Sequence, residues 1–126
     1  MTTLLILKPD GVKRKLESEF KAFLSNNKIK IVSYRHHTGS YPETVEKTKQ
    51  LYKEHYGKKF YAQLLDMMFN GRFIVYKVES PFLDVEGIRE IALKFRKKYA
   101  MDKTRNTIHA SDNEIKAKIE LNIFEL

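Results

Sequence analysis

The 126-residue sequence predicts an α+β fold, in which helices pack on an antiparallel β-sheet. Three observations support this prediction. Residues 4–7 are continuously apolar, as in a strand that is buried on both faces. Residues 28–33 alternate between side chains that suit opposite faces of a second strand. Apolar residues at helical spacing separate the predicted strands, and no internal repeat is present, so we expect residues 1–126 to form one domain.

In the first half of the chain, the strand at residues 4–7 ends at Pro9, which lacks an N–H group, and Gly11, which permits a turn. A helix follows and ends near residues 26–27, and the second strand runs from residue 29 to about residue 37. A loop at residues 39–42 precedes the next helix. The side chains expected on the inner faces of these two helices are Leu16, Phe20, Phe23, Leu24, Val45, Thr48 and Tyr52.

In the second half, an amphipathic segment after Gly57 ends at residues 70–71, and residues 73–78 form the third strand. Pro81 starts another helix, a charged stretch spans residues 94–105, and a short strand around His109 precedes the last helix. The side chains expected to face inward are Tyr61, Leu64, Leu65, Met68, Val85, Ile88, Ala92, Phe95, Ile115 and Ile119. Without the extra helices the order is βαββαβ, so we expect a ferredoxin-like antiparallel sheet.

Composition excludes several classes of site. The chain has no cysteine, so it forms no disulfide, thiolate nucleophile or cysteine-based metal site. The apolar N-terminal run is too short for a signal peptide or a membrane span, and we expect a soluble, cytoplasmic protein without a membrane partner. By itself, a net charge of +8 suits nucleotide phosphates, nucleic acid or an acidic membrane surface, although a lysine-rich solvated surface would give the same balance.

Residues 106–112 place a histidine where a strand runs into a helix. Thr107 and Ile108 are β-branched and favour an extended backbone. Ser111 and Glu114 match the S-x-x-E capping box, which would start the last helix. Such a strand end often faces a ligand crevice. Considered alone, however, this stretch slightly favours a structural His109 that forms a hydrogen bond near the surface.

Two motifs together carry a specific resemblance. Residues 8–14, Lys-Pro-Asp-Gly-Val-Lys-Arg, end the first strand, and Asn106-x-Ile108-His109-x-Ser111-Asp112 lies near the C-terminus. In this order and on this fold they resemble the nucleoside diphosphate kinase family. The similarity covers nearly the whole chain and includes Tyr52, the run at residues 57–61, Gly71 and Glu120.

The resemblance implies that His109 is a nucleophile that takes the γ-phosphoryl group of a nucleoside triphosphate and passes it to a diphosphate. Glu120 would hold the other ring nitrogen and fix the tautomer. Lys8, Arg89 and Arg96 match phosphate-binding cations, and Tyr52 would lie beside them. By spacing alone, Arg89 and Arg96 are equally explained as helix-surface arginines. Arg105 is expected to form a structural ion pair.

For the nucleoside, Asn106 and Lys8 match residues that bind the sugar hydroxyls, and Phe60 matches an aromatic that stacks on the base. Mg²⁺ would arrive with the nucleotide, held by its phosphates and water. No acidic cluster predicts a protein-held metal, so we interpret Asp10 and Asp112 as turn and cap residues.

The chain departs from the family pattern between Arg89 and Arg96, where only six residues replace a longer segment. The missing segment includes a phosphate-binding threonine, whose role would be left unfilled or would fall to a nearby lysine at position 94, 97 or 98. It also contributes to hexamer contacts, so we expect a homodimer, formed by the sheet edge and first helix. The side chains expected at this contact are Phe20, Phe23, Ile29 and Ile31.

Two functions, which belong to different classes, fit the sequence. The first is a nucleoside diphosphate kinase that works through a phosphohistidine. The alternative is a non-catalytic relative that binds nucleotides or nucleic acid in the same crevice, which the short segment and the +8 charge would suit. A nucleophile with an orienting carboxylate favours the first function, because a binding module needs neither.

Overall fold

The computed structural model describes residues 1–102 and 104–126. Its elements are β1 (Thr2–Leu7), α1 (Pro9–Lys13), α2 (Glu17–Asn26), β2 (Lys30–Thr38), α3 (Pro42–Leu51), the short 3-10 helix η1 (Lys53–His55), α4 (Tyr61–Phe69), β3 (Arg72–Glu79), α5 (Val85–Tyr99), β4 (Ile108–Ala110) and α6 (Glu114–Ile123). The predicted α+β class is confirmed. No helix in the described part of the chain is both long and apolar enough to cross a membrane.

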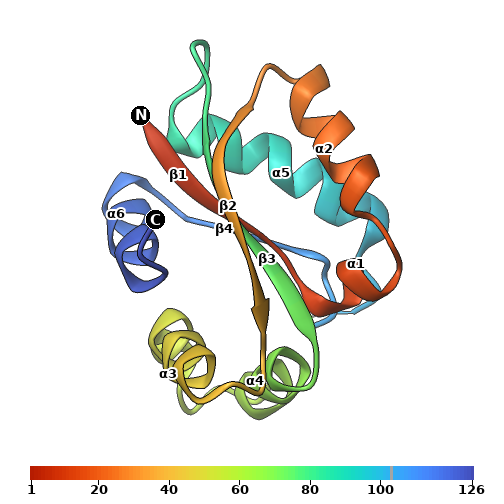
Figure 1. Cartoon of the computed structure of the whole chain (residues 1–126), viewed down its shortest axis with the longest axis vertical. Coiled ribbons are helices and arrows are strands. Elements are labelled where there is room, and N and C mark those ends of the chain that lie inside the picture. Colours follow the sequence, from red (N-terminus) through yellow and green to blue (C-terminus); the bar gives the residue numbers. More distant parts are fainter. Residues whose placement is uncertain (103) are drawn as a thin grey trace.

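The sheet has the strand order β2-β3-β1-β4, and each neighbouring pair is antiparallel. This is the predicted ferredoxin-like arrangement, with β1 in the interior beside β4 at one edge. Helices α2 and α5 cover one face of the sheet, and α3, α4 and α6 lie on the other side (Figure 1).

Strand β1 is buried on both faces because its alternating side chains enter two separate cores. Leu5 and Leu7 pack with Phe20 of α2 and Phe95 of α5. Leu4 and Ile6 belong to a second core, which is built against α3, α4 and α6. The prediction that the continuous apolar run forms a strand buried on both faces is therefore confirmed. It also fixes which side chains of β4 face each core, since β4 pairs with β1.

Helix α6 turns a different face inward from the one predicted. Ile115 and Ile119 are 71% and 52% exposed, whereas Ala117, Glu120 and Leu121 are buried. The spacing of the buried set is i, i+3, i+4, so it also forms one helical face. The helix begins one residue after Asn113, whose side chain accepts from the Lys116 N–H, and not at Ser111 as the capping box predicted.

The C-terminal segment is held against β2 through His37. Its ring stacks on Phe73 at 5.3 Å between ring centroids and meets the ring of Phe124 edge-on at 5.3 Å. The buried Nε2 has no hydrogen-bond partner among the described residues. Burial, together with the smaller effect of the neighbouring cations Arg35 and Lys47, lowers the pKa of His37 to about 4.

This environment predicts a loss of stability in mild acid. The folded-state pKa of His37 lies below the ordinary value of 6.5, so the unfolded chain takes up the proton first as the pH falls from about 6.5 to about 4. Because the site is partly solvated, we expect a cost of roughly 1–2 kcal/mol. The His37→Phe variant should lack this part of the loss, measured by urea unfolding at pH 7.5 and pH 4.5, while a His36→Phe control keeps it. Equal losses in both variants would contradict the assignment.

Candidate functional site

A cleft of about 370 Å³ opens on the face of the sheet that α6 covers. Its volume falls in the range of small-molecule sites. All the site residues predicted from the sequence line it. The lining residues are Lys8, Tyr52, Glu54, His55, Phe60, Leu64, Arg89, Arg96, Asn106, Ile108, His109, Ala110, Asp112 and Glu120.

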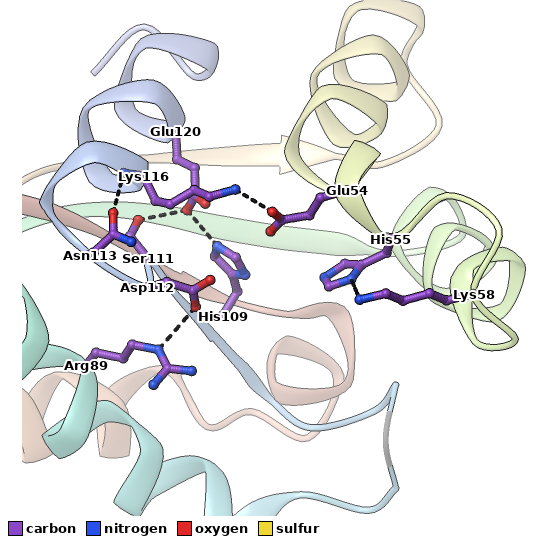
Figure 2. Close-up of polar contacts among 10 residues, drawn as sticks. All are labelled: Glu54, His55, Lys58, Arg89, His109, Ser111, Asp112, Asn113, Lys116 and Glu120. Atoms are coloured by element: carbon purple, nitrogen blue, oxygen red, sulfur yellow. Dashed lines mark hydrogen bonds and ion pairs between the residues drawn. The ribbon is translucent and has the colours of Figure 1, made fainter.

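The histidine is held by a carboxylate, as predicted. His109 pairs with Ile6 of β1, so its side chain leaves the sheet on the face that α6 covers. Its Nε2 lies 2.7 Å from Glu120 Oε1, which also accepts a 2.7 Å hydrogen bond from Ser111 Oγ (Figure 2). A carboxylate only accepts, so Nε2 carries the proton and Nδ1 is left with a free lone pair. Ser111 thus fixes Glu120 and does not cap α6.

The backbone before His109 is strained, and not extended as its β-branched residues predicted. Thr107 has φ 73°, a left-handed conformation that is costly for a β-branched residue. Two contacts hold it there. The Lys8 N–H donates to the Thr107 carbonyl at 2.8 Å, and Thr107 Oγ1 donates to Asp10 Oδ2 at 3.0 Å. The Lys-Pro-Asp motif and the histidine motif are therefore one structural unit, and Asp10 holds a turn as predicted.

Lys8 lies at the floor of the cleft and is only 3% exposed. Its Nζ donates to the Thr104 carbonyl at 3.0 Å and to Asn106 Oδ1 at 2.7 Å. Burial lowers the pKa of this ammonium group to about 8, against the opposing effect of Asp10. Arg105, next to this segment, forms the predicted structural ion pair with Asp102 at 2.7 Å.

Arg89 and Arg96 are brought together by helix α5, where seven residues make about two turns. The segment between them is helical, so the shortened loop that the resemblance placed there is not a loop in this structure. Arg89 Nε lies 3.3 Å from Asp112 Oδ1 in an ion pair, so Asp112 orients a cation and is not the helix cap we predicted. Burial, and then the charge of Arg89, lowers the pKa of Arg96.

Aromatic side chains line part of the cleft. The ring of Tyr52 meets His109 edge-on at 5.7 Å, and burial followed by the charge of Glu120 raises the pKa of its hydroxyl. That hydroxyl is buried and has no hydrogen-bond partner among the described residues. Phe60 lines the cleft and is half-buried beside the ring of His55, at 5.3 Å.

Two features of the cleft were not predicted from the sequence. His55 lines the cleft although no motif singled it out. Glu54 is ion-paired with Lys116, and this pair joins η1 to α6 across the cleft (Figure 2). The position of Glu54 and His55, two and three residues after Tyr52, was the only sequence signal. Lys94, Lys97 and Lys98, the predicted substitutes for a missing phosphate contact, are exposed and do not line the cleft.

The carboxylates of the cleft are already occupied by cationic or donor groups. Glu54 pairs with Lys116, Asp112 with Arg89, and Glu120 with His109. In the described residues, no group of three or more His, Asp and Glu side chains could hold a metal ion. The donor set suits an anionic ligand that brings its own divalent cation better than a metal held by the protein.

Comparison with known proteins agrees with this geometry. The family model for nucleoside diphosphate kinase matches residues 1–125. The nucleoside diphosphate kinase of Saccharolobus solfataricus is 34% identical over 132 positions, covering 97% of this chain and 92% of that protein. The Ignicoccus hospitalis enzyme is 30% identical, covering 95% and 85%.

Similarity extends to the fold of a solved structure. The nucleoside diphosphate kinase of Aquifex aeolicus superposes with a TM-score of 0.79 at 24% identity, over 98% of this chain and 93% of that one. Together with a family match over almost every residue, the catalytic interpretation is favoured over a non-catalytic relative. The chain belongs to the nucleoside diphosphate kinase family of phosphotransferases.

Proposed function

We propose that this chain, acting as a single domain, transfers the γ-phosphoryl group of a nucleoside triphosphate to a nucleoside diphosphate through a phosphohistidine on His109. The observation that carries the proposal is the 2.7 Å contact between His109 Nε2 and Glu120, which leaves Nδ1 free in a cleft lined by cations. The Nδ1 lone pair forms a bond to the γ-phosphorus. The bond from that phosphorus to the β,γ-bridging oxygen breaks, and the diphosphate leaves.

The remaining residues supply charge and position. Arg89, Arg96 and Lys8 neutralise the phosphate oxygens, and the Tyr52 hydroxyl, protonated at neutral pH, donates to one of them. Glu120 compensates the positive charge that develops on the imidazole. Asn106 and Lys8 bind the sugar, and Phe60 stacks on the base without reading its edges.

The family uses a divalent cation with the nucleotide, and we propose Mg²⁺, held by the phosphates and water. It would supply charge neutralisation between phosphate oxygens. Because each cleft carboxylate among the described residues has its own partner, none is assigned as a Mg²⁺ ligand.

Steady-state kinetics test the reaction. A covalent intermediate predicts parallel lines in double-reciprocal plots of rate against ATP at several fixed concentrations of a second nucleoside diphosphate. Intersecting lines would require both nucleotides in the cleft together and would contradict the proposal. Nucleic acid, the less favoured partner, should leave these rates unchanged.

Glu120→Gln should slow phosphorylation of His109 by roughly ten- to a hundredfold, since an orienting group is weakened while the amide oxygen still accepts from Nε2. Nucleotide affinity should stay within about twofold, because Glu120 is assigned no contact with the nucleotide. Rapid-quench measurement of the first turnover separates the two effects. An unchanged phosphorylation rate would remove Glu120 from the mechanism.

Members of the family are oligomeric, and we propose a homodimer as the basic unit. The contact that we propose differs from the one predicted from the sequence. Phe20 and Ile29 are buried in the core of their own chain, at 0% and 3% exposure, because α2 packs directly on the sheet. Phe23 and Ile31 are only partly buried against that core. The edge strand β2 instead exposes Val32 and Tyr34, at 45% and 51%.

We expect light scattering behind a sizing column to give the mass of two chains at micromolar concentration. Tyr34→Glu should shift that mass toward one chain, because a buried carboxylate at a two-fold contact meets its own copy. A mass of six chains that is unchanged on dilution would show that the dimer proposal is wrong.

A further inference from the structure

A second cavity, of about 800 Å³, lies beside the cleft and shares none of its lining residues. Pro9, Val12, Met67 and Met101 give it an apolar floor. Lys13, Arg14, Arg72 and Arg105 form its rim. We call this cavity the basic groove. Segments far apart in the chain meet in it, namely the turn after β1, the α4–β3 connection and the segment that follows α5.

The rim carries an excess of positive charge. Lys13 and Arg72 are exposed and have no ion-pair partner among the described residues. Arg14 donates to the Tyr99 carbonyl at 2.6 Å, which fixes the guanidinium without neutralising it. Arg105 is paired with Asp102, and Asp10 is the one acidic residue in the described lining. Three cations therefore face one carboxylate, which is itself 7% exposed.

The floor is not suited to an anion alone. Met101 is 56% exposed, and Met67 is partly buried against the core beneath it. Methionine side chains adapt to varied apolar partners, because they are unbranched and polarizable. A bare phosphate would leave this apolar surface in water. A ligand that combines carboxylates with apolar side chains would cover the floor and pair with the rim.

We propose that the basic groove is a docking site for an acidic segment of a partner protein, in which glutamate or aspartate residues alternate with leucine-like residues. Charge complementarity selects this occupant. A second copy of the chain also carries a net charge of +8 and presents the same positive rim, so self-association through the groove brings like charges together. Docking is separate from nucleotide transfer, because the groove and the cleft share no lining residue.

Fluorescence anisotropy of the full chain tests the proposal, with a short fluorescein-labelled peptide of leucine and glutamate as the probe. We expect saturable binding that a leucine–lysine peptide and a serine–glutamate peptide do not reproduce. Lys13→Glu combined with Arg72→Glu should weaken binding by about tenfold, since exposed ion pairs contribute modestly. Met101→Ser should also weaken peptide binding, because it removes apolar surface from the floor of the groove. The rate of phosphoryl transfer between nucleotides should be unchanged in these variants. An unchanged rate would show that they fold.

Lys28→Glu combined with Lys30→Glu is the matched control, because it reverses the same charge on a separate cavity. Equal loss of binding in this control would overturn the proposal in favour of nonspecific attraction. Binding of the serine–glutamate peptide as strong as that of the leucine–glutamate peptide would show that the floor is not used, which also overturns it. A fall in the mass of the unliganded protein on Lys13→Glu and Arg72→Glu substitution, measured by light scattering, would identify a second copy as the occupant and contradict an acidic partner.

Discussion

Replacing His109 with alanine is expected to reduce phosphoryl transfer by at least about a thousandfold, to the background rate. The loss is large because the variant lacks the nucleophile, and no other group in the cleft has its geometry. Among the described histidines, His109 is the one whose ring pairs with Glu120, and this contact leaves its other ring nitrogen free in the cleft that Arg89 and Arg96 also line. Nucleotide affinity should change little, since the cations and Phe60 remain. Coupled-enzyme rates and nucleotide titration measure the two quantities.

His36→Ala is the matched control for this variant, because His36 is exposed on β2 and far in the sheet from β4. It should transfer at the rate of the unchanged protein. His55→Ala tests a different role, since His55 lines the cleft beside Phe60. This variant is expected to lower nucleotide affinity more than it lowers the rate of phosphoenzyme formation. Normal transfer by His109→Ala would refute the central role of this residue.

Lys8→Met should lower kcat/KM by roughly a hundredfold. The substitution removes a buried cation from the phosphate end of the cleft, where low solvent access strengthens its interaction with the developing charge. It also leaves the Thr104 carbonyl and Asn106 Oδ1 without the Lys8 donor, so a lower melting temperature should accompany the loss. Lys94→Met, which removes an exposed cation from α5, should leave both quantities unchanged.

The pH profile separates the charge of Lys8 from its structural role. The pKa of Lys8 in the free protein is lowered to about 8, and only the protonated form attracts phosphate. We therefore expect kcat/KM to fall as the pH rises through about 8, and this limb should vanish in Lys8→Met. Retention of the same alkaline limb in Lys8→Met would assign it to another group.

The fold was predictable because its signals are local and redundant. The apolar run of β1, the helical spacing of α2 and α5 and the glycine and proline turns each indicated one element. The βαββαβ order then left one plausible sheet. The residues that line the cleft were predictable as a set because two motifs, distant in the chain, matched one family. Their convergence in one cleft follows from β1 and β4 being neighbours in the sheet.

The errors come from contacts between distant residues. Periodicity on α6 could not decide between the face of Ile115 and the face of Ala117, because both repeat at helical spacing. The face that turns inward is the one that carries Glu120, because its carboxylate contacts His109 and Ser111. The conformation of Thr107 likewise contradicts its β propensity, since the hydrogen bonds from Lys8 and to Asp10 outweigh it.

Helix α5 also shows why a resemblance does not fix a boundary. The arginine pair was expected to flank a shortened loop, but Val85–Tyr99 is one helix with Asp84 as its cap. Both arginines still reach the cleft, because seven residues of helix return to nearly the same face.

Incubation with ATP labelled in its γ-phosphate, without any acceptor diphosphate, tests the central claim most directly. We predict that one phosphoryl group per chain becomes attached to His109, that the bond is lost in acid and survives in base, and that added diphosphate removes the label as labelled triphosphate. A protein that turns over nucleotides without acquiring this label, or that carries it on a residue other than His109, would contradict the account.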